Sequence, residues 1–274
     1  MDVGALVPPI VWQLRPKRSM KLYESYDYAL ADSHTYEDPG VVHVVAMKTE
    51  AFRNALLSGH HTTVNNRQTV QNMFVLSYVW RDIPLDVLEI GGACGASYFE
   101  LNYFLPGRIN RWHVVETSTM SAAARRLFQD DRLIFYDDLE AAASQLKNLD
   151  LLIAQGVLQY VKDPLGTLET LLRLGFAFVY ITRTQVGEGI EAPIITKQVV
   201  NLSGHGPGPV SWEFVDRETS QPLTIVPFES ITSRVSVGHN TVYSFDEAEN
   251  TCMKIGSRSV RTKTIGFLLE KVRQ

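Results

Sequence analysis

The strongest pattern in the chain is a series of short, continuously apolar segments that begins after Pro84 and alternates with longer amphipathic stretches. Apolar segments that do not alternate with polar residues are typical of parallel strands covered on both faces. We predict strands at 85–90, 112–115, 133–136, 149–154 and 176–181, and helices at 96–104, 118–128, 138–146 and 163–174. This order of elements predicts an α/β fold built on a parallel sheet.

The segment before these strands has a different pattern. Residues 1–80 are predicted to be mostly helical, with broad apolar runs at 41–57 and 70–80 that suit buried helices. We expect this region to form a helical cap or lid, followed by the main domain at 81–274.

The last third of the chain lacks long helical patterns. Glycine and proline crowd residues 187–210, and three later runs, at 223–228, 241–245 and 264–270, are predicted to be strands. We therefore expect the parallel strands to be finished by antiparallel C-terminal strands. Within this part, residues 187–262 are expected to form an insertion on the substrate side.

Charge and cysteine usage narrow the classes of partner. The net charge of −4 argues against a surface built to hold nucleic acid, because such a surface needs a basic stripe. Cys94 and Cys252 are far apart and lie in no metal-ligand spacing, so the sequence predicts neither a disulfide framework nor a metal site. We expect a small-molecule partner, and the sequence leaves open whether the chain forms a homodimer.

The N-terminal residues include an apolar run at 3–14 that is followed by a basic cluster at 15–18. The run is too short to span a bilayer, so no stable membrane insertion is expected. It could dock on the body of the protein, or it could make a peripheral membrane contact. A cytoplasmic location is the default expectation.

A turn of very small residues follows the first predicted strand. Residues 87–95 read Val-Leu-Glu-Ile-Gly-Gly-Ala-Cys-Gly, and a helix is expected to begin directly after them. Small residues let a ligand approach the backbone, and a Cβ at Gly91 or Gly95 is expected to stand in its way. The helix start adds unpaired N–H groups and the positive end of a dipole. Such a turn is also compatible with a tight connection that binds nothing.

Acidic residues end the next two strands. Glu116 follows the second strand and could accept hydrogen bonds from both hydroxyls of a ribose. Asp137 and Asp138 follow the third strand, where a carboxylate could receive the amino group of an adenine. Asp138 is equally suited to cap the following helix, so its role stays open.

Residues 89–95 resemble the first motif of class I S-adenosylmethionine-dependent methyltransferases, in which an acid precedes three alternating glycines. Ala93 replaces the middle glycine of that motif. The resemblance implies a Rossmann-like fold with S-adenosyl-L-methionine as the cofactor. It also implies the cofactor-binding residues, which are Glu89, Gly91, Gly92, Ala93, Gly95, Glu116, Asp137, Asp138, Leu139, Gln155 and Gly156.

More narrowly, the chain resembles a bacterial methyltransferase family often associated with surface-polysaccharide genes. The matching segments lie at 8–11, 28–31, 36–39, 88–98, 137–140 and 157–164, and the resemblance covers roughly residues 5–185. The segment Thr182-Arg183-Thr184 resembles the end of the family's fifth strand, although Thr182 stands where the family usually has an acid. The acceptor expected from this resemblance is a sugar or a nucleotide-sugar, methylated at a hydroxyl or an amine.

Methyl transfer needs an acceptor held in line with the methyl group and, for a hydroxyl or amine, a base that removes a proton. His205 lies in a glycine-rich loop after the fifth strand, and we expect it to be free of packing; it could be a base or simply an exposed loop residue. His60 and His61, in the cap region, are further candidates. The candidate substrate-binding residues after strands four and five are Gln159, Tyr160 and Arg183, and Arg183 could clamp an anionic group of the acceptor.

Two other classes of function remain open. A nicotinamide-dependent oxidoreductase would need G-x-G-x-x-G, but Ala93 and Ala96 occupy two of those glycine positions. A methyltransferase-like protein that binds the cofactor or a partner without turnover is also compatible with the sequence, since a fold does not establish an activity.

Overall fold

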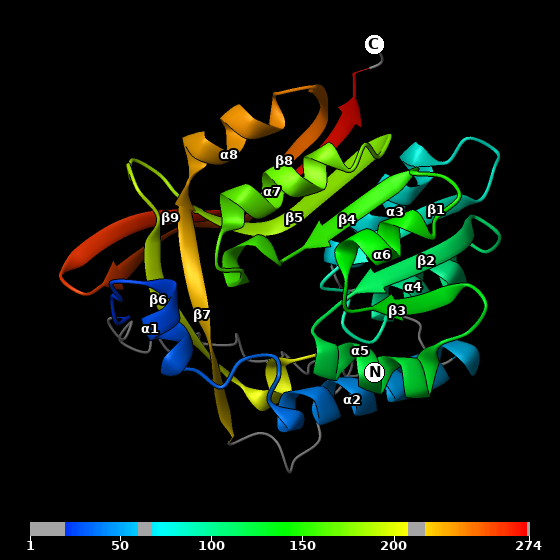
Figure 1. Cartoon of the computed structure of the whole chain (residues 1–274), viewed down its shortest axis with the longest axis horizontal. Coiled ribbons are helices and arrows are strands. Elements are labelled where there is room, and N and C mark those ends of the chain that lie inside the picture. Colours follow the sequence, from blue (N-terminus) through cyan, green and yellow to red (C-terminus); the bar gives the residue numbers. More distant parts are fainter. Residues whose placement is uncertain (1–19, 60–66, 208–216, 273–274) are drawn as a thin grey trace, which may run out of the picture.

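The computed structural model describes residues 20–59, 67–207 and 217–272. Its centre is a twisted sheet in which five parallel strands lie in the order β3-β2-β1-β4-β5 (Figure 1). These strands are β1 (Leu85–Ile90), β2 (Ile109–Val115), β3 (Leu133–Tyr136), β4 (Leu151–Gln155) and β5 (Phe178–Gly187). They are buried because their apolar side chains face helices on both sides.

Two long C-terminal strands extend the sheet beyond β5. β9 (Arg258–Lys271) pairs antiparallel with β5, and β8 (His239–Ile255) pairs antiparallel with β9. The order along this path is therefore β3-β2-β1-β4-β5-β9-β8, and β9 is the strand that runs against the others. The prediction of a parallel sheet finished by antiparallel strands is confirmed.

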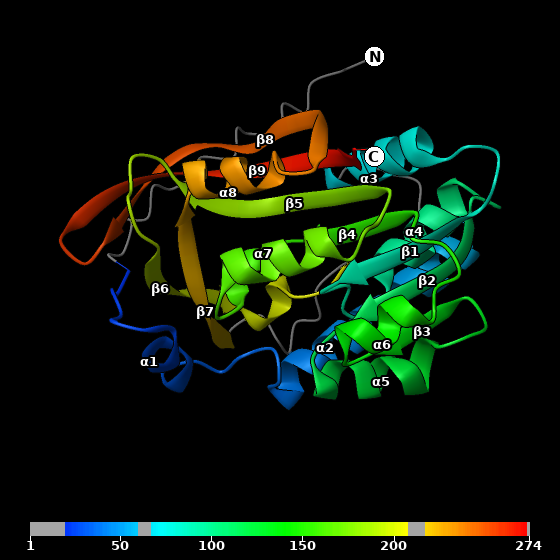
Figure 2. The ribbon, with the colours of Figure 1, turned by 45° about the horizontal axis from the view of Figure 1, so that its top comes forward.

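Helices cover both faces of the sheet and enclose two separate cores (Figure 2). One face carries α2 (Pro39–Leu57), α3 (Arg67–Val79), α4 (Ala96–Phe104) and α5 (Ser118–Phe128). The other face carries α6 (Leu139–Ser144), α7 (Pro164–Arg173) and α8 (Phe228–Val235). Since α2 and α3 share a core with β1 and β2, the N-terminal helices pack into the body of the protein.

A β-hairpin stands at the carboxyl end of β5. It consists of β6 (Ile194–Asn201) and β7 (Glu218–Pro227), and β7 touches β5 only at its last two residues. The short helix α1 (Tyr26–Ala31) packs on this hairpin, and the 3-10 turns η1 (Leu158–Tyr160) and η2 (Leu202–Gly204) lie between the hairpin and the main body. The hairpin therefore lies on one side of the sheet edge where β1 and β4 end.

The helices and strands predicted for residues 85–181 are confirmed, but β5 continues to Gly187, so the prediction that Arg183 follows this strand is wrong. The three later strands are also confirmed, and each is longer than predicted. Strand β6 and helix α8 were not predicted. The division into a cap, a main domain and an insertion stays a prediction. In the part of the chain that the structure describes, no helix has both the length and the apolar character needed to cross a membrane.

Candidate active site

The turn after β1 is built from three residues in the left-handed region of backbone space. Gly91 has φ +72°, Ala93 has φ +50° and Gly95 has φ +80°. Glycine adopts this region at little cost, whereas an L-residue with a Cβ loses about 1–2 kcal/mol there. Ala93 therefore keeps the backbone shape of the alternating-glycine motif and carries a conformational cost that a glycine would not.

The small size of these residues has a different reason from the one expected. A Cβ on Gly91 would lie 2.3 Å from Cγ2 of Val157, and a Cβ on Gly95 would lie 3.1 Å from Leu133. The expectation that such a Cβ would block a ligand is wrong, because the protein itself fills both spaces. The glycines are needed for their backbone conformation and for packing of the turn against β3 and η1.

The buried side chain of Glu89 packs against the turn at Gly92. Its carboxylate accepts a hydrogen bond of 2.9 Å from Nε1 of Trp112, and the side chain is 1% exposed. A Cβ on Gly92 would lie 2.5 Å from Oε2 of Glu89, so the absent side chain makes room for the carboxylate. Burial raises the pKa of Glu89 to about 7, although hydrogen bonds from Ser97 and Trp112 act in the opposite direction.

Glu116 lies at the tip of β2, beside the turn. Its Oε1 accepts a hydrogen bond of 3.0 Å from the backbone N–H of Ala93, and its Oε2 accepts one of 2.9 Å from the N–H of Thr117. Burial raises the pKa of this carboxyl, and the nearby charge of Glu37 adds to the effect. Each carboxylate oxygen can accept a further hydrogen bond, so the pair is suited to a ligand that donates two adjacent hydroxyls.

The two acids after β3 have different partners. Oδ1 of Asp138 accepts a hydrogen bond of 2.7 Å from the N–H of Ala141 and caps α6, which resolves the open alternative in favour of capping. Asp137 forms an ion pair of 2.9 Å with Arg125, and this pairing lowers the pKa of Asp137. Of these two carboxylates, Asp137 is the one left to face a ligand at the end of β3.

Tyr36 and Glu37, which precede α2, lie near Glu116, and no site role was predicted for them. Tyr36 lies close enough to Glu116 and Arg183 for both charges to act on its hydroxyl, and burial is the main cause of its raised pKa. The next residue, Glu37, accepts a hydrogen bond of 3.3 Å from the N–H of Thr119, at the start of α5. The only local sign of this role is an aromatic and an acid directly before the Asp-Pro start of α2.

The three candidate substrate-binding residues lie on two neighbouring elements, Gln159 and Tyr160 on η1 and Arg183 on β5. Nε2 of Gln159 donates a hydrogen bond of 3.0 Å to the carbonyl of Arg183, while Oε1 of Gln159 is buried without a partner among the described residues. Tyr160 packs edge-to-face on Tyr36, with ring centroids 5.7 Å apart, and the two hydroxyls share a hydrogen bond. Their roles in binding stay predictions.

Arg183 is held in an unusual position. Its φ is +55°, and its side chain lies over Gly156, where a Cβ would be 3.6 Å from Cβ of Arg183. Gly156 itself has φ +68° and donates a hydrogen bond of 2.9 Å to the carbonyl of Thr182. The left-handed backbone at Arg183 coincides with the register shift between β5 and β9, and it leaves this residue exposed within β5, beside the end of β4.

The remaining predicted cofactor residues lie at the same edge. Gln155 ends β4, and its Oε1 accepts a hydrogen bond of 3.3 Å from Nδ2 of Asn72 on α3. Leu139 is the first residue of α6 and packs on the core of that face. The ends of β1, β2, β3 and β4 thus bring the predicted cofactor residues to one edge of the sheet.

His205 is placed differently from the expectation. Its ring is 7% exposed, Nε2 lies 2.8 Å from Oγ1 of Thr219, and the ring packs edge-to-face on Tyr36. The expectation that the surrounding glycines free it from packing is wrong. Burial, with a smaller effect from Lys48, lowers its pKa, so the ring is neutral at neutral pH. His60 and His61 lie outside the described residues.

Neither a family model nor a curated protein matches the sequence. Among solved structures, the N-terminal domain of EvdMO1 with SAH bound is similar at 14% identity, with 76% of this chain and 82% of that chain covered and a TM-score of 0.44. The CcbJ methyltransferase from Streptomyces caelestis is similar at 12% identity, covering 76% and 91%, with a TM-score of 0.45. Magnesium protoporphyrin IX methyltransferase (ChlM) from Synechocystis PCC 6803 with bound SAM is similar at 11% identity, covering 73% and 79%, with a TM-score of 0.41.

Because these identities are low, we assign the fold from the order and direction of the strands. Five parallel strands in the order 3-2-1-4-5 are followed by one antiparallel strand that lies between β5 and the other C-terminal strand. This arrangement, together with helices on both faces, is a Rossmann-like sheet.

Proposed function

We propose that this protein transfers a methyl group from S-adenosyl-L-methionine to a small-molecule acceptor. The observation that carries the proposal is the carboxylate of Glu116, which the N–H of Ala93 holds at the tip of β2 beside a turn of left-handed residues. Among the described residues the hydrogen bonds to this partly buried acid come from backbone N–H groups, so it is costly to charge, and a ligand with two adjacent hydroxyls would stabilise the charged form.

The residues at this edge fit the parts of an adenosyl cofactor. The ribose hydroxyls would be held by Glu116, because its two oxygens retain acceptor capacity. The adenine would lie toward Asp137 and Leu139, and the amino-acid tail toward the backbone of Gly91 and Gly92. The support for this assignment is the meeting of these residues at the ends of adjacent parallel strands.

When bound, the cofactor supplies a methyl group on a sulfonium, which is an excellent leaving group. The task that remains for the chain is to hold the acceptor in line with that methyl. Gln159, Tyr160 and Arg183 would line the acceptor side, and Tyr36 would separate it from Glu116. The raised pKa values of Tyr36 and Tyr160 keep both phenols protonated, and the hydroxyl of Tyr160 donates to Oε1 of Gln198.

The acceptor we propose is a sugar or nucleotide-sugar that is methylated on a hydroxyl or an amine. An exposed guanidinium at Arg183 suits a phosphate or carboxylate on such a molecule. For proton removal we propose His205, which is neutral at neutral pH and packs edge-to-face on Tyr36. His60 and His61 stay alternative predictions for the same role.

The experiment that tests the proposal is incubation with S-adenosylmethionine carrying a labelled methyl group and with small-molecule extracts enriched in sugars and nucleotide-sugars. Label transferred to an extract component, and lost in a Glu116→Gln variant, is the expected result. Cofactor binding without transfer to any extract would favour a non-catalytic binding protein. A change in absorbance or fluorescence with reduced nicotinamide, and none with S-adenosylmethionine, would favour an oxidoreductase.

A further inference from the structure

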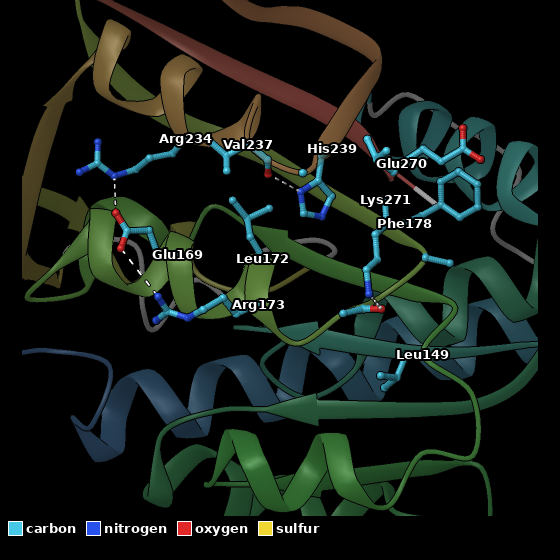
Figure 3. A pocket seen from close by; sticks show the side chains of 14 residues that line it. Leu149, Glu169, Leu172, Arg173, Phe178, Arg234, Val237, His239, Glu270 and Lys271 are labelled. Carbon is cyan, nitrogen blue, oxygen red and sulfur yellow. Dashed lines mark hydrogen bonds and ion pairs between the residues drawn. The ribbon is translucent and has the colours of Figure 1, made fainter. Parts of the chain in front are cut away.

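A pocket lies at the edge of the sheet opposite to the candidate active site. It has a volume of about 1150 Å³ and is lined by the end of α7, the end of α8, the start of β8 and the end of β9 (Figure 3). Leu149 and Phe178 belong to its lining and mark the amino ends of β4 and β5. Because Glu116 lies at the carboxyl end of a parallel strand, the two sites are separated by the length of the strands.

The pocket contains a buried nitrogen that has no partner. His239 is 9% exposed, and its Nδ1 lies 3.1 Å from the carbonyl of Val237. A carbonyl only accepts, so Nδ1 carries the proton and Nε2 is left without a hydrogen bond among the described residues. Figure 3 shows the ring directed toward the space between Leu172 and Lys271. An unsatisfied buried ring nitrogen of this kind costs stability, and a bound ligand can satisfy it.

Positive charge predominates around this nitrogen. The lining side chains that carry charge are Glu169, Arg173, Arg234, Glu270 and Lys271. Glu169 is paired with both arginines, at 2.8 Å from Arg234 and 4.0 Å from Arg173. Glu270 points away from the pocket, whereas Lys271 points into it and donates one long hydrogen bond, of 3.5 Å, to the carbonyl of Gly175.

The rest of the wall is apolar. Leu172 on α7, Val237 after α8 and Leu149 before β4 surround the polar groups. Val237 is 74% exposed, so its side chain is a hydrophobic surface that gains stability when it is covered. The combination of a cationic group, an unpartnered ring nitrogen and an apolar wall is suited to a molecule that is anionic at one end and apolar at the other.

We propose that this pocket binds a small amphipathic carboxylate, with the carboxylate between Lys271 and His239 and the apolar part against Leu172 and Val237. With such a ligand, both nitrogens of His239 would donate, one to the Val237 carbonyl and one to the carboxylate. Binding is independent of the methyl-transfer site, and no covalent step is involved.

The test is calorimetric titration of the full chain with octanoate and, as a neutral analogue, with 1-octanol. We expect saturable octanoate binding that S-adenosylhomocysteine does not compete away, and octanol binding weaker by about fivefold or more. Lys271→Glu should weaken octanoate binding by about tenfold or more. Lys254→Glu reverses the charge of an exposed residue on β8 outside the pocket, and it should leave the octanoate affinity within about twofold of the wild type.

A second variant separates binding from folding. His239→Asn can keep the hydrogen bond to the Val237 carbonyl but removes the ring nitrogen that faces the pocket, so it should weaken octanoate binding with little change in thermal stability. Absence of octanoate binding would overturn the proposal, as would equal affinity for octanol, equal affinity in Lys271→Glu, or competition by S-adenosylhomocysteine.

Discussion

The indole nitrogen of Trp112 donates a hydrogen bond of 2.9 Å to the carboxylate of Glu89, so that a buried acid on β1 is anchored by a buried aromatic on β2. This pair lies directly beneath the turn that we assign to the cofactor. Burial nevertheless raises the pKa of Glu89 to about 7. The charged form of this residue therefore carries an energetic cost at physiological pH.

The raised pKa of Glu89 predicts a pH-dependent stability. Its ordinary value is 4.5, so the folded protein binds one more proton than the unfolded chain between about pH 4.5 and pH 7. The free energy of unfolding should therefore fall as the pH rises through this window, by up to about 3 kcal/mol for this residue. The shift at Glu116 has the same sign.

Urea denaturation at a series of pH values measures this dependence. Glu89→Gln keeps an oxygen that can accept from Trp112 but cannot ionise, so its profile should be flatter than that of the wild type between pH 5 and about pH 8. Identical slopes in the two proteins would show that the carboxyl of Glu89 does not titrate in this range.

The left-handed backbone at Ala93 predicts an unusual effect of glycine. Ala93→Gly should stabilise the protein by up to about 1 kcal/mol, because relief of the strain at φ +50° exceeds the entropy that glycine adds to the unfolded chain. The same substitution at Ala96, in the first turn of α4, should destabilise by about 0.5–1 kcal/mol. Thermal unfolding of both variants checks the signs, and two losses of stability would contradict the left-handed assignment.

The contact between Glu37 and the start of α5 should stabilise the fold. Glu37→Ala removes an acceptor for the N–H of Thr119 and a negative charge near a helix N-terminus, and we expect a loss of about 0.5–2 kcal/mol. Glu37→Gln keeps an acceptor, so its loss should be smaller. Glu50→Ala, on the exposed side of α2, is the control. Equal effects of Glu37→Ala and Glu50→Ala on chemical denaturation would remove the capping role.

The position of Arg183 separates acceptor binding from cofactor binding. Arg183→Asn is the preferred variant, since asparagine tolerates a left-handed backbone such as the φ of +55° found here. Once an acceptor is known, the acceptor KM should rise by about tenfold or more while the cofactor Kd stays within about twofold. If the acceptor KM and the cofactor Kd rise by similar factors, Arg183 supports the site as a whole.

The main sheet could be predicted from the sequence because each strand is a continuous apolar segment that ends at a turn residue. Strand β6 was missed because it lies at the edge, with β7 as its partner strand, and its residues alternate in burial inside a region rich in glycine and proline. Helix α8 was missed because it is short and lies between two strand patterns. Local periodicity carries little information about such elements.

The cofactor side of the site was more predictable than the acceptor side. Glu89 lies near the end of β1, and Gly91 and Glu116 directly follow β1 and β2, so the topology alone brings them together. The burial of His205 depends on Tyr36 and Thr219, which are distant in the sequence, and the position of Tyr36 over Glu116 depends on how the N-terminal segment packs. Contacts of this kind are set by tertiary packing and leave no local pattern.

The central claim is that Glu116 holds the ribose of an adenosyl cofactor. Its most direct test is the Kd of S-adenosylhomocysteine, measured by calorimetry in the wild type, in Glu116→Gln and in Glu140→Gln, which alters an exposed acid at the same edge of the sheet. We predict saturable binding by the wild type, a loss of tenfold or more, about 1.4 kcal/mol, in Glu116→Gln, and little change in Glu140→Gln. No binding by the wild type, or equal affinity in all three proteins, would contradict the account.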